Sequence, residues 1–505
     1  MKRILFFILT GLYLIIGVTS CFNDEGNYDY VELPDFYVDT TGIISYHLVT
    51  QFETFAIPSR LVYVGDKSGL DFIWAIYRSG GGQSTVTADT LAHTENFAAP
   101  ITVTPGSYYL EFCAIERATG VRATQRYSLT VESANGAGLL AFYQKNGTGD
   151  CDLIRTPLFI GALQESSVKR SLYTQANPGH PLTGEPIRMG TVSSGTNQYI
   201  NLLTESDIVR LSAIDMTITF DFNGIFWTAP SVCKPEGWYF SGDELLINDG
   251  LAYVTIVGWS NGMPLFPGPK VLMNGEYRAS PHGIISYANC VIIYDELAKR
   301  FLHCTEWSSE LTLPSTGGAF DMTAVGKEQL YLDNGFTDVS ATFYGYSVMQ
   351  TPGNPAQRSL YVFKTNGNAS NCSGVAVIDL STCPAIAQAN LFAVSSLGPI
   401  LYYATDNSIY KSTFGLSDQS LAAPSAASWT CPAGETVTCM RLFKHAGISL
   451  SESAVCKYLL VATWNGSEGK VYIFSANIAT GELSAAPVET YGQFGHIKDL
   501  QFKAQ

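Results

Sequence analysis

The residues that could carry out catalysis are few and widely spaced. The 505-residue chain holds seven histidines, and no two stand at the close spacing of a zinc site on one helix or hairpin. The Gly-x-Ser-x-Gly pattern occurs once, over residues 258–262, but prolines at 264 and 267 follow it where a nucleophile turn requires a helix, and no glycine-rich loop opens a helix. A pair of glycosidase carboxylates cannot be chosen among 44 acidic residues. The sequence therefore favours a binding protein over an enzyme, with a surface hydrolase as the alternative. The histidines are His47, His93, His180, His282, His303, His445 and His496.

Two acid-rich turns are the candidate metal sites. One runs from Asn146 to Asp152 and the other from Asp333 to Asp338. Carboxylate and carbonyl oxygens are the ligands that calcium prefers. Asp and Asn also favour turns for conformational reasons alone. We therefore expect no metal or other cofactor, with calcium at these turns as the alternative.

Aromatic side chains gather between residues 222 and 259. Such side chains can stack on sugars or pack against peptides and partner proteins. The alternative is that most of them fill a β core. The candidate binding residues are Trp227, Trp238, Tyr239, Tyr253 and Trp259.

Two cysteines flank a probable hairpin centred near Leu297. Cys290 and Cys304 each lie seven residues from that centre, so they would face one another across the two strands. Directly opposed residues are close enough for a disulfide in an oxidising compartment. We predict that this pair is close and that it can be oxidised to a disulfide.

The amino terminus has the features of an export signal. Lys2 and Arg3 precede an apolar run over residues 4–18, which is shorter than the roughly 20 residues of a membrane-spanning helix. The run ends in Val18-Thr19-Ser20-Cys21, and small residues before a cysteine resemble a bacterial lipobox. We predict a signal peptide over residues 1–20 and a lipid on Cys21. The alternative is a plain secretory signal cut nearby.

Composition favours a folded β protein outside the cytoplasm. Only 14% of residues are charged, and the 46 glycines, 28 tyrosines and 27 phenylalanines suit short strands joined by tight turns. Removing Lys2 and Arg3 from 29 basic residues leaves 27 against 44 acidic ones, a net charge of −17. Such a surface repels phosphate backbones, so nucleic acid is excluded as a partner.

The first folded domain is predicted over residues 31–134. A β-rich run, 70–77, has Trp74 near its centre, and strands over 107–115 and 127–131 are joined through Thr119-Gly120. Strands at this spacing around one tryptophan are typical of an Ig-like sandwich. The tyrosine-rich strand before the last one resembles a polycystic-kidney-disease (PKD) type domain.

Residues 136–505 are predicted to form a β-propeller. Strand pairs around Asn-Gly and Asp-Asn turns recur every 45–50 residues or so, which indicates about seven blades. A jelly roll or large double sandwich is the alternative. The final strand, 496–502, is predicted to complete the first blade, which begins near Leu139, and so to close the ring.

The organisation of the whole chain resembles a known family. Two acids, Asp24 and Glu25, stand close behind Cys21, and residues 21–30 form an acidic tether that contains the run Asn27-Tyr28-Asp29-Tyr30. This start, followed by a PKD-type domain and a long β domain, resembles the PKD-like lipoproteins of Bacteroidetes. A solvated tether that happens to be acidic is the alternative interpretation of the two acids.

The resemblance implies display on the outer surface of the outer membrane. It also implies an accessory role beside a SusC-like TonB-dependent transporter and a SusD-like lipoprotein in nutrient uptake, by substrate capture or scaffolding. Oligopeptides are preferred over glycans as the nutrient. A free-standing adhesin or spacer is the alternative to an importer subunit.

Overall fold

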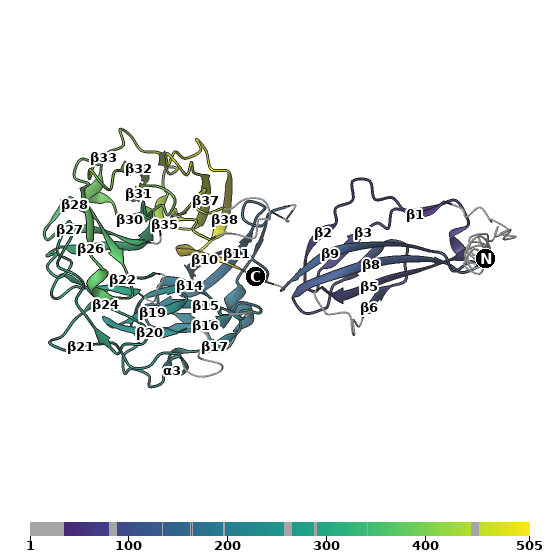
Figure 1. Ribbon diagram of the computed structural model, residues 1–505, viewed down its shortest axis with the longest axis horizontal. Coiled ribbons are helices and arrows are strands. Elements are labelled where there is room, and N and C mark those ends of the chain that lie inside the picture. Colours follow the sequence, from purple (N-terminus) through teal and green to yellow (C-terminus); the bar gives the residue numbers. More distant parts are fainter. Residues whose placement is uncertain are drawn as a thin grey trace, which may run out of the picture. The chain divides into compact units, whose positions relative to one another are not determined.

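The chain is all β apart from short helical turns, as the sequence predicts (Figure 1). The computed structural model describes residues 35–79, 88–133, 135–161, 163, 165–194, 197–256, 265–286, 290–340, 342–445 and 454–504. The signal peptide, Cys21 and the tether lie outside these residues. Within them, no helix is long and apolar enough to cross a bilayer.

The described chain divides into two compact units. The first comprises residues 35–45, 56–99 and 109–127, and the second comprises 46–55, 100–108 and 128–504. The strands β8 and β9 of the sandwich run through both units, so the division does not fall at the 134–136 boundary expected from the sequence. The boundary between the two domains predicted from the sequence, at residues 134–136, therefore stays a prediction.

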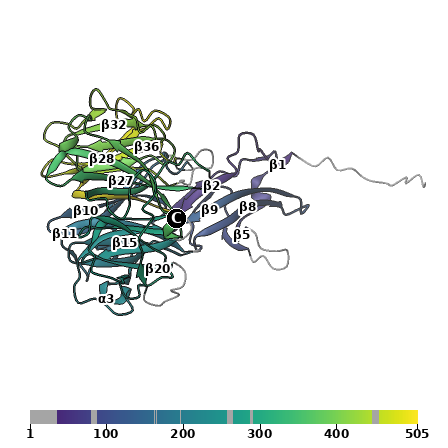
Figure 2. The same cartoon turned by 60° about the vertical axis from the view of Figure 1, so that its left-hand side comes forward.

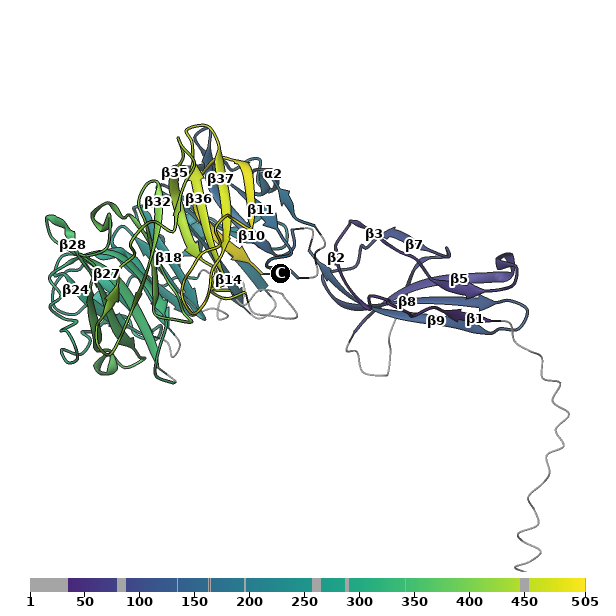
Figure 3. The same cartoon turned by 90° about the horizontal axis from the view of Figure 1, so that it is seen from above.

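The amino-terminal strands form a sandwich. A five-stranded sheet has the order β2-β9-β8-β5-β6, and two short pairs, β1-β4 and β3-β7, complete the fold (Figure 3). A 3-10 turn, η1 (Lys67–Gly69), precedes β5. The strands are β1 (Phe36–Val38), β2 (Tyr46–Thr50), β3 (Thr54–Ile57), β4 (Leu61–Tyr63), β5 (Leu70–Arg78), β6 (Asp89–Ala92), β7 (Phe97–Pro100), β8 (Gly106–Glu116) and β9 (Arg122–Glu132).

Trp74 is the centre of the sandwich core. It is fully buried, and its ring packs against Phe97, Phe112 and Tyr127 with centroids 5.4, 4.8 and 6.2 Å away. Its indole Nε1–H donates to the carbonyl of Thr94 at 3.0 Å. The predicted strand around Trp74 is therefore confirmed, and its one polar atom is satisfied within the core.

The rest of the described chain forms seven sheets of three to five strands, which are the blades of a propeller. Blade 1 contains β10 (Gly138–Lys145), β11 (Thr148–Arg155), β12 (Ser167–Lys169) and β13 (Leu182–Thr183), with α2 (Leu172–Ala176) between the last two. Blade 2 contains β14 (Pro186–Ser194), β15 (Asn197–Thr204), β16 (Ile208–Ser212) and β17 (Ile218–Phe220), followed by α3 (Phe222–Ile225). Blade 3 contains β18 (Pro235–Ser241), β19 (Asp243–Asn248) and β20 (Leu251–Ile256).

The later blades repeat this antiparallel pattern. Blade 4 contains β22 (Ala279–Ser286), β23 (Cys290–Asp295) and β24 (Arg300–Cys304), flanked by the pair β21 (Val271–Leu272) and β25 (Glu310–Leu311). Blade 5 contains β26 (Glu328–Gly335), β27 (Phe343–Thr351), β28 (Asn354–Thr365) and β29 (Gly374–Asp379), with η2 (Ala369–Asn371) before β29 and η3 (Ile386–Gln388) after it. Blade 6 contains β30 (Leu391–Val394), β31 (Ile400–Ala404), β32 (Ser408–Phe414), β33 (Leu421–Ala422) and β34 (Trp429–Thr430). Blade 7 contains β35 (Thr436–Leu442), β36 (Tyr458–Trp464), β37 (Gly469–Ser475) and β38 (Glu489–Phe494).

The carboxyl-terminal strand closes the ring. Strand β39 (His496–Lys503) pairs with β10, with Leu139 opposite Phe502 and Ala141 opposite Leu500. The inner strands then follow one another around a circle in the order β39, β14, β18, β22, β26, β30, β35 and back to β39. Both the predicted seven blades and the predicted closure by the final strand are confirmed.

Each blade packs on the next through an apolar cluster. In β10, Leu140 and Phe142 contact blade 2, while Leu139 and Ala141 contact blade 7, because alternate side chains of a strand point to opposite faces. Figure 2 shows the strands of the blades beside one another. Near the axis the blades approach so closely that a side chain does not fit. A Cβ at Gly237 would lie 2.3 Å from the carbonyl oxygen of Pro281 in blade 4.

Candidate functional site

A polar channel lies at the centre of the ring. Its cavity of about 560 Å³ is lined by residues from all seven inner strands. That volume falls within the range of small-molecule binding sites. The polar residues that carry the argument below are Arg188, Tyr239, His282, Asp333, Asn334, Arg441, Lys444 and Lys498.

One buried carboxylate joins three of the inner strands. Asp499 of β39 is fully buried, and its Oδ1 accepts hydrogen bonds from Nε and Nη2 of Arg441 in β35, at 2.9 and 2.8 Å. Its Oδ2 accepts from the backbone N–H of Met189 in β14, at 2.9 Å. Burial alone would lower the pKa of Arg441, but the adjacent carboxylate outweighs this and raises it. The guanidinium is therefore a permanent, fixed positive charge in the channel wall.

Arg188 is a second cation, and it is held differently. Its guanidinium lies over the ring of Tyr239, 4.1 Å from the centroid, and Nη1–H donates to the Tyr239 hydroxyl at 3.3 Å. Among the described residues no carboxylate lies within ion-pair distance of Arg188, and its buried Nε has no hydrogen-bond partner. An unpaired buried donor costs free energy, so this atom is available to an acceptor brought by a ligand or by water.

The third cation, Lys444, is partly neutralised. Its Nζ donates to Oδ2 of Asp333 at 2.7 Å, and the same oxygen accepts from the Tyr331 hydroxyl at 3.0 Å. Burial alone would raise the pKa of Asp333, but the Lys444 ammonium holds it below its usual value. The Oδ1 of Asn334, the next residue, is buried without a partner. The indole Nε1 of Trp238, which also lines the cavity, has no partner either, so the channel wall offers two unpaired donors and one unpaired acceptor.

The channel is positively charged within an acidic protein. It is lined by Arg188, Arg441, Lys444 and Lys498 and by the carboxylate of Asp333, and the buried Asp499 behind the lining pairs with Arg441. Lys498 pairs with Glu185 at 3.0 Å. Burial, followed by the charges of Arg188 and Arg441, lowers the pKa of His282 to about 4. His282 is therefore neutral at pH 7, and the lining attracts anions although the whole chain carries a net charge of −15.

The four aromatic candidates that the structure describes do not share one surface. Trp238 and Tyr253 are buried in the core between blades 2 and 3, as the alternative interpretation held. Trp227 is 67% exposed at the end of α3, and Tyr239 lines the channel. Trp259 lies outside the described residues. Of the candidates that the structure describes, Tyr239 and an edge of the buried Trp238 line the channel, and Trp227 and Tyr253 do not.

The predicted disulfide needs correction. In the structure, Cys304 is opposite Val291, one residue from the expected register, and the hairpin loop holds four residues, with Lys299 at φ +52°. A shift of one residue places a side chain on the other face of a sheet. Cys290 thus packs towards blade 5 and Cys304 towards blade 3, and both are free thiols.

Protein groups surround the carboxylates of the two candidate calcium turns. Asp150 accepts from the backbone N–H of Cys151 and Tyr173, at 2.8 and 3.2 Å. Asp152 accepts from Arg170 at 2.8 Å, and in the second turn Asp333 is paired with Lys444. Calcium at either turn would have to displace these donors, and it remains untested.

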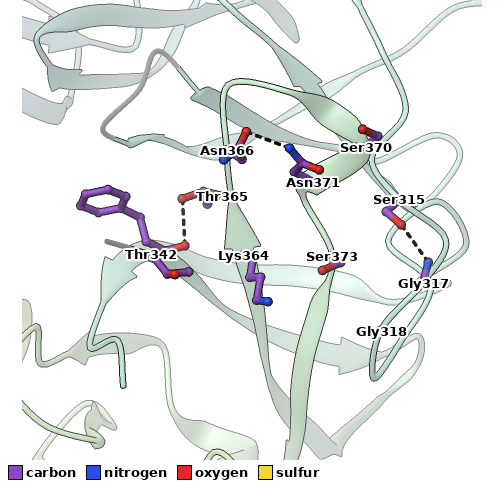
Figure 4. Close-up of a pocket in the computed structure, with 11 residues that line it drawn as sticks. Ser315, Gly317, Gly318, Thr342, Lys364, Thr365, Asn366, Ser370, Asn371 and Ser373 are labelled. Carbon is purple, nitrogen blue, oxygen red and sulfur yellow. Dashed lines mark hydrogen bonds between the residues drawn. The ribbon is translucent and has the colours of Figure 1, made fainter. Parts of the chain in front are cut away.

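A second cavity, of about 760 Å³, lies between blade 5 and the segment that precedes it in the chain (Figure 4). Its walls are hydroxyl and amide side chains with one cation, Lys364. The side chain of Asn371 approaches that of Asn366 at 3.5 Å, and the hydroxyl of Thr365 donates to the Phe343 carbonyl at 3.1 Å (Figure 4). The lining residues are Ser315, Gly317, Gly318, Thr342, Phe343, Lys364, Thr365, Asn366, Ser370, Asn371 and Ser373.

Sequence reasoning missed the channel. Its charged residues come from strands far apart in the chain, and Lys444 and Asp333 are separated by 111 positions. The one local signal was a charged residue within an apolar inner strand, such as Arg441 in Thr436–Leu442.

Comparison with known proteins finds solved structures of low similarity. The crystal structure of a quinonprotein alcohol dehydrogenase-like protein from Bacteroides thetaiotaomicron is 14% identical, with a TM-score of 0.42, over 93% of this chain and 100% of that one. The β-propeller domain of Nup133 from Vanderwaltozyma polyspora is 10% identical, with a TM-score of 0.33, over 63% of this chain and 91% of that one. No curated protein sequence matches.

With TM-scores this low, the propeller assignment rests on the strand order of the chain itself. The family match is independent of these structures. It begins at Cys21 and extends beyond the sandwich through the first blade, over about a third of the chain. Residues 21–186 thus match the PKD-like family, and a seven-bladed β-propeller begins within that match and continues to the end of the described chain.

Proposed function

We propose that this chain is a surface lipoprotein that binds an anionic nutrient in its propeller channel as a subunit of a SusCD-type TonB-dependent importer. An oligopeptide is preferred over a glycan, because each free peptide ends in a carboxylate. The observation that carries the binding role is Arg188, with its guanidinium held on Tyr239 and its buried Nε unpaired.

The charge of the channel supports an anionic ligand. A carboxylate that reaches Arg188 would gain charge-assisted hydrogen bonds without first breaking an ion pair. Arg441 and Lys444 would add to the attraction, although each already has a carboxylate partner. Capture by these fixed groups needs no reactive side chain, so binding without catalysis is the simplest role for the site.

The amino terminus supports the location. A lipid on Cys21 would confine the protein to a membrane, and the acidic tether behind it suits display on the outer face of the outer membrane. Confinement makes association with a transporter two-dimensional, so that modest interfaces suffice. The family match that begins at Cys21 fits this proposal.

The importer role is tested by purification from the native host. A tagged copy is extracted in mild detergent, purified by affinity and analysed by mass spectrometry. We expect a SusC-like barrel and a SusD-like lipoprotein in near-equal amounts. A chain that purifies alone and cleaves peptides or glycans would contradict the proposal in favour of a hydrolase, and one that purifies alone without activity would favour an adhesin or spacer.

The lipid anchor is tested in the same strain. The Cys21→Ala variant should remain an unlipidated precursor, fail to partition with membranes and lose the importer from the purified material. Cys113→Ala, which changes a cysteine of the sandwich, is the matched control and should leave both properties unchanged. Labelling of the Cys21→Ala chain by a fatty-acid probe would show that the anchor is elsewhere.

A further inference from the structure

Two thiols and one imidazole meet in the core between blades 4 and 5. The Sγ atoms of Cys290 and Cys372 lie 4.0 Å apart, although the two residues are 82 positions apart in the chain. Together with a ring nitrogen of His303, all three donor atoms lie within 4.8 Å of one another. Cys290 and Cys372 are fully buried and His303 is 4% exposed, so the three donors are fixed by the surrounding core.

The hairpin register in the structure explains why these three side chains lie close together. His303 is directly opposite Ile292, and Cys290 is two residues along the same strand, on the same face. That face packs against blade 5, where Cys372 follows η2 and begins the approach to β29. The shift that removes Cys304 from the reach of Cys290 therefore brings His303 close to it.

A fourth donor is present at the same point. The backbone carbonyl of Asn366 lies 3.0 Å from His303 Nε2 and 3.3 Å from Cys372 Sγ. Because Nε2 and Cys372 Sγ share this neighbour, Nε2 is the nitrogen that faces the thiols. The set is then two sulfurs, one nitrogen and one oxygen.

These contacts match the requirements of a zinc site. Two Zn–S bonds of about 2.3 Å at a tetrahedral angle would place their sulfurs about 3.8 Å apart, close to the 4.0 Å in the structure. The observed separation is much longer than the S–S bond of a disulfide, which is about 2.05 Å. Cysteine and histidine are also the protein ligands that zinc prefers.

The outer contacts of the imidazole fit as well. Its Nδ1 lies 3.3 Å from the hydroxyl oxygen of Thr312, and that hydroxyl donates to the His303 carbonyl at 3.2 Å. With Nε2 on a metal, Nδ1–H would donate to Thr312, which is the arrangement that orients most metal-bound histidines. The backbone N–H of Asn366 also points at Cys372 Sγ, at 3.3 Å, and would stabilise a thiolate there.

The second cavity borders the residues around the cluster. Asn371 and Ser373, which flank Cys372 in the chain, line this cavity, and so does Asn366 (Figure 4). A hydrated ion could therefore come within one layer of side chains of the donors. An entry path is one of the features required of a genuine metal site.

We propose that Cys290, Cys372 and His303 bind a zinc ion, with the Asn366 carbonyl as the fourth ligand, and that this ion links blade 4 to blade 5. On binding, the two thiols release their protons to solvent and the imidazole binds through its neutral Nε2. This site is separate from the central channel and does not depend on the proposed importer role.

Cobalt and zinc titrations of the full chain test the site. The protein is reduced, freed of metal with a chelator and titrated with Co²⁺ alone. We expect one Co²⁺ per chain, sulfur-to-cobalt charge-transfer absorption and the intense visible bands of four-coordinate cobalt. Zn²⁺ should abolish these bands and raise the melting temperature.

Substitutions assign the ligands. Cys290→Ser and Cys372→Ser should each weaken binding by about 100-fold or more, and Thr312→Val by about 10- to 100-fold. Cys304→Ser is the matched control, because Cys304 is equally buried and adjacent to His303 but lies on the other face. It should leave the cobalt spectrum unchanged.

Two results would overturn the proposal. One is a wild-type chain without charge-transfer absorption, whatever the folding of the variants. The other is a mass spectrum, taken before reduction, that shows a disulfide joining Cys290 and Cys372 in the protein from its native host.

Discussion

The centre of the sandwich is filled by aromatic side chains, whereas the centre of the propeller holds a polar channel. In the sandwich, Trp74 and three neighbouring rings fill the interior, and the one polar atom of Trp74 is paired with Thr94. In the propeller, the apolar clusters lie between the blades, and the axis is left as a polar channel with unpaired atoms on Arg188 and Asn334. A filled centre contributes stability, whereas an open and charged centre leaves groups available for a ligand.

The largest effect should come from removing the strand that closes the ring. Deletion of residues 496–505 takes Ile497, Leu500 and Phe502 from the core between blades 7 and 1, and leaves Arg441 without Asp499. The lost interactions should exceed the free energy of unfolding of the propeller, which is about 5–15 kcal/mol for a typical domain. Circular dichroism and proteolysis should show an unfolded propeller. A chain lacking only residues 504 and 505 is the control and should fold normally.

The next effect concerns the filled centre of the sandwich. Trp74→Ala should destabilise the sandwich by about 3–5 kcal/mol, because it leaves a large cavity among aromatic rings. Denaturant unfolding followed by circular dichroism measures the change, because Trp74 is the only tryptophan of the sandwich and its removal leaves no fluorescent reporter there. Tyr37→Ala, at a position 51% exposed, is the control and should change stability by less than about 0.5 kcal/mol. An equal effect of both substitutions would contradict the filled-core description.

A smaller effect concerns the titration of His282. Its pKa is about 4 in the folded chain and about 6.5 when unfolded, so the unfolded state binds more protons between these values. Stability should therefore fall by about 1–3 kcal/mol as the pH falls from 7 to 4, and His282→Gln should remove this part of the slope. Melting temperatures measured between pH 7 and pH 4 for both chains test this fall in stability. An unchanged slope in His282→Gln would show that His282 is protonated equally in both states.

The smallest effect on stability should come from Arg188, although it carries the proposed binding. It has no carboxylate partner among the described residues, so Arg188→Gln removes chiefly the cation–π contact with Tyr239, worth about 0.5–1 kcal/mol. A melting curve that matches the wild type to within a few degrees is expected. A much larger loss would mean that Arg188 supports the ring itself.

The architecture could be predicted because its signals are local. Asn-Gly and Asp-Asn turns between short apolar strands mark hairpins, and their spacing gives the blades. The channel and the thiol cluster could not be predicted, because their residues are far apart in the sequence. Arg441 and Asp499 are separated by 58 positions, and Cys290 and Cys372 by 82 positions. The predicted pairing of Cys290 with Cys304 was wrong because a shift of one residue in the hairpin register decides which face of the sheet a side chain occupies.

The central claim is that the channel captures an anionic ligand through Arg188. Its most direct test is calorimetric titration of the full chain with an acidic oligopeptide at low and high salt. We predict binding that weakens with salt, and a dissociation constant about 10- to 100-fold higher for Arg188→Gln, since a charge-assisted hydrogen bond contributes about 1.5–3 kcal/mol. Lys364→Gln, in the second cavity, is the control and should bind like the wild type. Failure of the wild-type chain to bind, or equal affinity in Arg188→Gln, would contradict the claim.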